Sequence, residues 1–255
     1  QELIDRYPDA LPKSFTFIAA KITDNRILLK ADPGYLANLQ ALHPVEQERL
    51  LKGNWKIRYG GGKLINREWF QFVDSAPQGL LWVRFWDLAA TAREVAKQTH
   101  FYTAGVLMGI TPDKQTFYVK DAIAEQKGPG EVKALIASVA AMDGPGVLVR
   151  WELEGGSAGK MVENDLLSAL RGFNASSVRP MGDKVTRFIP YATAASNGQI
   201  FMVRGDWNNQ YLNALVKFDG SPQPLVNDFA DASSGSFTVL NPGPSTIEAL
   251  QAMYG

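Results

Sequence analysis

The sequence contains no cysteine and only two histidines among its 255 residues. The lack of cysteine excludes a disulfide-stapled secreted domain, a zinc ribbon and thiol catalysis. The 26 basic residues are balanced by 26 acidic residues, so the formal net charge is zero, which excludes a strongly basic nucleic-acid coat protein. No apolar run approaches the ~20 residues that span a bilayer, so no membrane partner is expected.

What the sequence does contain is typical of a folded globular protein, because 45% of the residues are hydrophobic and 11% are aromatic. The chain begins Gln-Glu-Leu rather than with methionine, and we expect it to be a fragment of a longer polypeptide. Residues 1–79 are rich in turn-forming residues between two short helical patterns, at 35–42 and 45–51, and are predicted to form an irregular appendage. Residues 241–255 are predicted to form a C-terminal tail.

Residues 80–240 alternate between strand-like and helical patterns, which predicts an α/β fold for this domain. A turn at 111–114 joins two strands as a hairpin, so the sheet must be mixed, and helices would flank it. The predicted strands are 80–88, 101–110, 116–123, 147–153, 177–179 and 200–203. The predicted helices are 129–142, 159–170, 184–196, 207–218 and 228–240.

Five acidic residues occupy positions where carboxylates could converge. Asp87 ends an apolar strand, Glu152 and Glu154 lie two apart on a later strand and so share a face, and Asp228 and Asp231 lie three apart at a helix start. Taken singly, each could be a turn cap, a solvent-exposed strand end or a first-turn helix acid. Taken together, they suit Mg²⁺ or Mn²⁺, which prefer oxygen ligands.

Such an acid set predicts a metal-dependent site for phosphoryl transfer. Two ions about 3.5–4 Å apart can hold the attacking water and the leaving oxygen of a phosphodiester. Lys184 and Arg187, one helical turn apart, could contact phosphate, or they could belong to a solvated helix face. Lys160 follows the glycines Gly155 and Gly156, which could bind phosphate through backbone amides or could simply form a tight turn.

Four segments carry a resemblance to a known family. They are 85–91 (Phe-Trp-Asp-Leu-Ala-Ala-Thr), 151–160 (Trp-Glu-Leu-Glu-Gly-Gly-Ser-Ala-Gly-Lys), 182–187 (Gly-Asp-Lys-Val-Thr-Arg) and 227–235 (Asn-Asp-Phe-Ala-Asp-Ala-Ser-Ser-Gly). With these segments in this order, residues 80–240 resemble the C-terminal nuclease domain of the large terminase subunit of tailed bacteriophages, the genome-packaging motor.

The resemblance implies an RNase H-like fold and a two-metal, Mg²⁺- or Mn²⁺-dependent endonuclease that cuts concatemeric double-stranded viral DNA during packaging. Carried over by position, the catalytic residues would be Asp87, Glu152 and Asp231. The choice of the second acid stays open between Glu152, which we favour, and Glu154. The metal ligands would be Asp87, Glu152, Glu154, Asp228 and Asp231, and the DNA-binding residues would be Lys160, Lys184 and Arg187.

The resemblance also implies partners and a location. Residues 1–79 would form the linker or edge of the ATPase domain, whose Gly-x-x-x-x-Gly-Lys-Ser/Thr loop does not occur in this sequence. Further partners would be double-stranded DNA, the ATPase half of the same polypeptide, the portal and the small terminase subunit. The protein would act in the host cytoplasm at the procapsid portal and be absent from the mature virion. Two alternatives remain, a nuclease resembling Holliday-junction resolvases and a non-catalytic module that docks to the portal or capsid.

Overall fold

A computed structural model describes residues 22–53, 64–88, 102–153 and 155–242 of the chain. They belong to two compact units, which are taken separately here. The first unit contains the short helices α2 (Arg26–Ala31), α3 (Tyr35–Gln40) and most of α4 (Pro44–Leu50). Asn25 begins α2, since its side-chain oxygen accepts a hydrogen bond from the backbone N–H of Leu28 at 3.1 Å. Within the described ranges, no helix has both the length and the apolar character needed to cross a membrane.

The second unit is built on a mixed seven-stranded sheet with the order β1-β7-β4-β3-β2-β5-β6. Strand β3 is antiparallel to both of its neighbours, whereas β2, β5 and β6 run parallel to one another, as do β1, β7 and β4. The strands are β1 (Gln71–Val73), β2 (Leu81–Asp87), β3 (Thr103–Ile110), β4 (Phe117–Glu125), β5 (Leu148–Glu152), β6 (Ala175–Val178) and β7 (Ile200–Val203).

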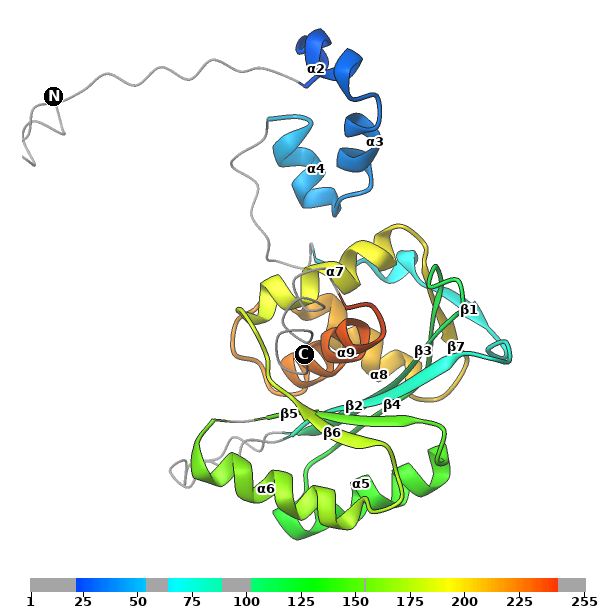
Figure 1. Ribbon diagram of the computed structural model, residues 1–255, viewed down its shortest axis with the longest axis vertical. Coiled ribbons are helices and arrows are strands. Elements are labelled where there is room, and N and C mark those ends of the chain that lie inside the picture. The colour runs from blue at the N-terminus through cyan, green and yellow to red at the C-terminus, as the bar shows by residue number, and fades with distance from the viewer. Residues whose placement is uncertain (1–21, 54–63, 89–101, 154, 243–255) are drawn as a thin grey trace, which may run out of the picture. The chain divides into compact units, whose positions relative to one another are not determined.

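Helices cover both faces of this sheet (Figure 1). Helices α5 and α6 pack against one face, and α7, α8 and α9 pack against the other (Figure 1). The helices are α5 (Pro129–Asp143), α6 (Gly156–Ala169), α7 (Lys184–Ser196), α8 (Asn208–Lys217) and α9 (Val226–Leu240). The α/β prediction, with a mixed sheet flanked by helices, is therefore confirmed.

The alternation of side chains along β2 determines what faces each layer. Val83 belongs to the hydrophobic core under α7, α8 and α9, whereas Trp86 belongs to the core under α5 and α6. Phe85 shares the face of Val83 and lies directly beneath Gly235 of α9, where a Cβ atom would come within 2.3 Å of the Phe85 ring. Glycine at 235 thus lets α9 approach β2 closely, and Asp87 points to the same side of the sheet as α9.

One charged residue lies in the middle of β2, in a strand that the sequence pattern predicts to be buried. Arg84 is only 2% exposed, and its guanidinium donates two hydrogen bonds to Asp143, both at 2.8 Å, and one to Asp121 at 2.7 Å. The two carboxylates neutralise a charge whose burial would otherwise cost several kcal/mol. Arg84 thereby ties β2 to the end of α5 and to β4.

The sheet also includes residues from the first 79 positions of the chain. Strand β1 pairs in parallel with β7, and Leu64, Ile65 and Phe70 are buried in the core under α7, α8 and α9. Residues 64–73 are therefore integral to the unit that contains the sheet. This segment is too short, and its periodicity too weak, for its pairing to be evident from the sequence pattern.

Candidate active site

Two of the predicted site residues end neighbouring parallel strands. Asp87 is the last residue of β2 and Glu152 is the last residue of β5, so both lie at the carboxyl edge of the sheet. Trp86 and Trp151, which precede them, are register partners and are buried together under α5 and α6. Because side chains alternate along a strand, Asp87 and Glu152 point to the opposite face, toward α7 and α9.

Helix α9 brings two more carboxylates to this position. Asp228 and Asp231 lie in its first two turns and are 7% and 2% exposed, respectively. The negative charges of Asp231, Asp228 and Glu152 all act on the Asp87 carboxyl group, so the four acids form one electrostatic cluster. The structure therefore brings together Asp87, Glu152, Asp228 and Asp231, four of the five acids that the sequence analysis names.

The first turn of α7 supplies two cations to the same cluster. Asp183 caps this helix by accepting a hydrogen bond from the Thr186 N–H at 3.0 Å, which places Lys184 and Arg187 on the first turn. Lys184 forms an ion pair with Asp231. Cations at a helix N-terminus oppose the helix dipole, so their position there is explained by the acids that they face.

Arg187 connects the two ends of the cluster. Its Nη1 donates to Oε2 of Glu152 at 2.7 Å, and its Nη2 donates to Oδ1 of Asp231 at 3.0 Å. With Lys184 and Arg187 as the two cations against four carboxylates, the cluster retains excess negative charge. The carboxylates of the cluster therefore repel one another.

Burial and repulsion shift the ionisation of the acids. Burial is the largest cause that raises the pKa of Asp87 well above its usual value, followed by the charges of Asp231, Asp228 and Glu152, while Lys184 opposes the shift. Burial also raises the pKa of Asp231, although the hydrogen bond and charge of Lys184 and the charge of Arg187 counteract it. Titratable groups with such perturbed pKa values are common at functional sites.

Asp228 differs from the other three acids because its carboxylate accepts hydrogen bonds from backbone N–H groups. Its Oδ2 accepts hydrogen bonds from the N–H groups of Leu225 at 2.9 Å and of Tyr102 at 3.2 Å. Burial raises the pKa of Asp228, and these two hydrogen bonds oppose the shift. The Asp228 carboxylate thus stabilises the start of α9. The residue before this helix, Leu225, has a φ of 65°, which is unusual for a non-glycine residue.

The donor set of this cluster suits a hard divalent cation, since every candidate ligand is a carboxylate oxygen and the cluster carries excess negative charge. In the described part of the chain, however, no three His, Cys, Asp or Glu side chains are arranged so that they could hold an ion as they stand. Both carboxylate oxygens of Asp231 and the Oε2 atom of Glu152 are engaged by cations instead. Glu154 lies outside the described residues, so the choice between Glu152 and Glu154 stays open.

Lys160, the remaining predicted DNA-binding residue, lies apart from these ion pairs. It is exposed on the second turn of α6 and lines a pocket together with Arg179, which follows the end of β6. Sequence patterns alone give no reason to single out Arg179. Arg179 lies at the carboxyl end of β5 because β6 pairs with β5, and Val178, which precedes Arg179, is the register partner of Glu152.

Comparison with known proteins agrees with this architecture. The family described as terminase RNase H-like domain matches residues 84–235, which is more than half of the chain. The nuclease domain of the P22 large terminase is 14% identical, with a TM-score of 0.51, over 72% of this chain and 93% of that one. This likeness supports the RNase H-like fold.

Two further structures are more distant. The Mn-bound large terminase nuclease domain of bacteriophage SPP1 is 12% identical over 69% of this chain and 98% of that one, with a TM-score of 0.47. The yeast mitochondrial Holliday junction resolvase is 12% identical over 67% and 82%, with a TM-score of 0.39. No curated protein matches the sequence. On the family match, and with the fold that accompanies it, this chain belongs to the terminase RNase H-like domain family.

Proposed function

We propose that this protein is a divalent-metal-dependent endonuclease that cuts concatemeric double-stranded viral DNA during genome packaging. The observation that carries the proposal is the convergence of Glu152, Asp228 and Asp231 on Asp87, from three separate elements, and the raised pKa of the Asp87 carboxyl group. The carboxylates of the cluster repel one another, so the binding of a cation among them would stabilise the site. Family membership supports a role in terminase, and the P22 relative is itself described as a nuclease domain.

Asp87, Glu152 and Asp231 would hold Mg²⁺ or Mn²⁺, with Asp228 and Glu154 as further candidate ligands. When bound, two such ions would supply an activated water and stabilisation of the departing 3′ oxygen. Asp87 must be ionised to act as a ligand, so its raised pKa makes metal uptake stronger as the pH rises. Lys184 and Arg187 form ion pairs with Asp231 and Glu152 and would contact a phosphate of the DNA backbone.

The wider role follows from the same proposal. The part of residues 1–79 that precedes residues 64–73 would connect this domain to an ATPase half of the same polypeptide, since residues 64–73 belong to the sheet unit. The assembled protein would work with the portal and the small terminase subunit. The site of action would be the host cytoplasm at the procapsid portal, without retention in the mature virion.

The decisive experiment is a plasmid cleavage assay in Mg²⁺ or Mn²⁺ with the Asp87→Asn variant. We expect the wild-type chain to cut and the variant to cut at least about 100-fold more slowly, since the charge of a candidate metal ligand is lost. Asp113→Asn is the matched control, because Asp113 lies exposed in the turn between β3 and β4 and should leave cleavage unchanged. Circular dichroism would verify that each variant is folded.

Each alternative has its own outcome in that assay. Equal cleavage by wild type and Asp87→Asn would overturn the site. Strong preference for a four-way junction over linear duplex would favour a resolvase-like nuclease. If Mn²⁺ neither promotes cleavage nor binds in a calorimetric titration, the chain is a docking module. Crystals soaked in Mn²⁺, examined by anomalous scattering, would identify the ligands and decide between Glu152 and Glu154.

A further inference from the structure

An open pocket lies at the same carboxyl edge of the sheet, beyond Glu152. Its volume is about 380 Å³. The next residue after Glu152, Leu153, lines the pocket and donates its N–H to the Val178 carbonyl at 2.9 Å, so the ends of β5 and β6 stay side by side there. The lining residues are Leu153, Gly155, Gly156, Lys160, Arg179 and Pro180.

The charge of this pocket is positive. Lys160 comes from the second turn of α6 and Arg179 from the segment after β6, and both residues are exposed. Unlike Lys184 and Arg187, neither one forms an ion pair with any residue that the structure describes. No acidic residue belongs to the described lining, and the neighbouring Glu154 lies outside the described residues. Two cations converging on a hollow without a partner among these residues favour an anionic ligand.

The glycines of the lining leave room inside the pocket. Gly156 has a φ of 86°, which only glycine adopts readily, so its identity follows from the backbone. Gly155 has a φ of −69°, and a Cβ atom there would meet no atom within 4 Å. Neither conformation nor packing therefore requires glycine at 155, and that part of the pocket is empty space with accessible backbone.

We propose that the pocket is a second phosphate subsite, in which Lys160 and Arg179 hold a backbone phosphate of the duplex that is cut at the acidic cluster. This inference rests on the proposed nuclease function and adds Arg179 to the DNA-binding residues. Double-stranded DNA carries about one negative charge per 1.7 Å of its axis, so a duplex engaged at Glu152 presents further phosphates to the same edge of the sheet. Contacts of this kind position the duplex without reading its sequence.

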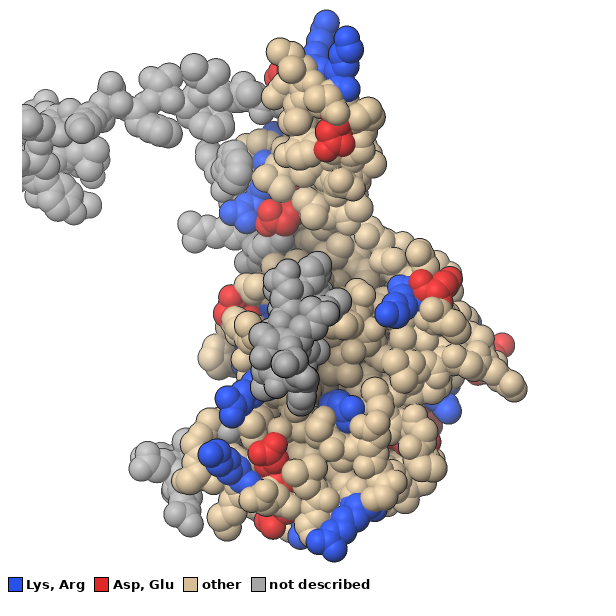
Figure 2. All heavy atoms as spheres, in the orientation of Figure 1, with Lys and Arg blue, Asp and Glu red and all other residues tan. Residues whose placement is uncertain are grey.

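The distribution of charge on the exposed surface makes local phosphate sites important for DNA binding. On the face drawn in Figure 2, the basic side chains of the described residues are scattered and interspersed with acidic ones. With the formal charge of the whole chain at zero, affinity for DNA has to come from small groups of unpaired cations.

The test is a salt titration of DNA binding by fluorescence anisotropy, with a labelled linear duplex and EDTA present to prevent cleavage. Each phosphate contact contributes about 0.9 to the slope of log K against log salt. We expect the double variant Lys160→Gln/Arg179→Gln to lower the magnitude of this slope by about 1.8, the sum for two contacts. The matched control is Lys114→Gln/Arg171→Gln, which removes the same charge from exposed positions next to the opposite ends of the strands and should leave the slope unchanged.

Equal slopes for wild type and the pocket variant would overturn the subsite, and so would equal reductions in the pocket and control variants. Cleavage in Mg²⁺, measured on the same preparations, separates this proposal from the proposed function. If wild type cuts but the slopes do not change, only the subsite fails. If the slope falls as expected but wild type does not cut, the phosphate site stands as a binding site and the nuclease proposal fails.

Discussion

Glu152 at the end of β5 and Asp231 on α9 are held by one guanidinium group, that of Arg187, at 2.7 Å and 3.0 Å. Asp231 also pairs with Lys184, so the two cations of α7 neutralise two of the three carboxylates that surround Asp87. These ion pairs keep acids from three elements close together without a metal. The arrangement explains how a repulsive cluster is compatible with a stable fold.

Substitution of Arg187, which pairs with both Glu152 and Asp231, should increase the repulsion among the carboxylates and destabilise the fold. Arg187→Gln leaves Asp231, which is 2% exposed, with Lys184 as its remaining ion-pair partner in the described residues. We expect the free energy of unfolding in EDTA to fall by about 1–3 kcal/mol, and Mg²⁺ to restore more stability to this variant than it adds to wild type. Urea unfolding measures both effects.

The control for that variant is another arginine in an ion pair. Arg204 pairs with Asp74, but their side chains are 63% and 93% exposed, so Arg204→Gln should change stability by less than about 0.5 kcal/mol. A loss as large as that of Arg187→Gln would contradict the role assigned to the cluster.

The pH dependence of stability follows from the raised pKa of Asp87, whose main cause is burial. At low pH the carboxyl group is protonated in both the folded and unfolded states and adds no repulsion. The unfolded chain ionises this carboxyl group at the ordinary aspartate pKa, whereas the folded protein keeps it protonated up to the raised pKa. Stability is therefore lost as the pH rises from the first pKa through the second. Asp87→Asn, which mimics the protonated form, should therefore melt near wild type in acid and above it at neutral pH.

Thermal unfolding in EDTA measures this difference, and each 1 kcal/mol corresponds to about 2–4 °C for a chain of this size. Mg²⁺ should narrow the gap by stabilising the wild type alone. This account would be refuted if the variant melted below wild type at pH 7.5, or if the difference in melting temperature did not change with pH. Either result would show that ionisation of Asp87 does not destabilise the folded protein.

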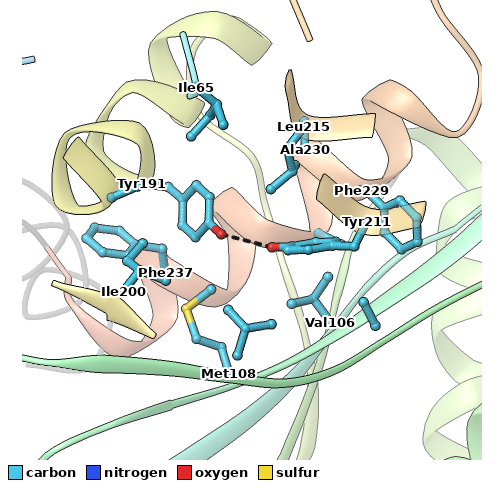
Figure 3. Close-up of a cluster of buried hydrophobic side chains, with 14 of the residues drawn as sticks. Ile65, Val106, Met108, Tyr191, Ile200, Tyr211, Leu215, Phe229, Ala230 and Phe237 are labelled. Atoms are coloured by element: carbon cyan, nitrogen blue, oxygen red, sulfur yellow. Dashed lines mark hydrogen bonds between the residues drawn. The ribbon is translucent and has the colours of Figure 1, made fainter. Parts of the chain in front are cut away.

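Buried hydroxyl groups link α7, α8 and α9. Figure 3 shows the first of these hydrogen bonds, between Tyr191 and Tyr211. Tyr191 of α7 and Tyr211 of α8 share a hydrogen bond at 3.0 Å, and Tyr211 is bonded to Ser233 of α9 at 2.6 Å. Burial raises the pKa of Tyr211 to about 12, so the hydroxyl stays neutral at ordinary pH. The three hydroxyls therefore connect α7, which carries Arg187, to α9, which carries Asp231.

We expect Tyr211→Phe to destabilise the protein more than Tyr191→Phe. In Tyr211→Phe, the Tyr191 hydroxyl loses the hydrogen bond that it shares with Tyr211 in the described residues. An unsatisfied buried hydroxyl costs about 1–3 kcal/mol. In Tyr191→Phe, by contrast, Tyr211 keeps its bond to Ser233. Urea unfolding of the two variants gives the order directly, and the reverse order would refute this account.

The close contact of α9 with β2 predicts the effect of a single added methyl group. In Gly235→Ala the new Cβ would lie 2.3 Å from the Phe85 ring, so the helix or the ring must move, at a cost of about 1–3 kcal/mol. Phe85→Leu in the same chain should relieve part of that clash, so the double variant should lose less stability than the two single changes added together. Gly155→Ala, which meets no atom within 4 Å, is the control.

The sequence predicted those features that depend on local periodicity. The β3–β4 hairpin, the helices α5 to α9 and the alternation that turns Asp87 away from the Trp86 side all follow from patterns of a few residues. Arg84 shows the limit of such patterns, because its two carboxylate partners, Asp121 and Asp143, lie 37 and 59 positions away. Nothing within β2 itself indicates that its buried charge is neutralised.

By itself, then, the sequence determined the α/β class, the terminase RNase H-like family and the set of acids that suit a divalent cation. The tertiary structure alone decided which cations neutralise those acids, that Asp228 also holds the start of α9, and that Arg179 joins Lys160 in a pocket beside Glu152. The physical reason is that strand order and helix packing bring together side chains from distant parts of the chain. Electrostatic interactions depend on those distances in space, which local sequence periodicity does not encode.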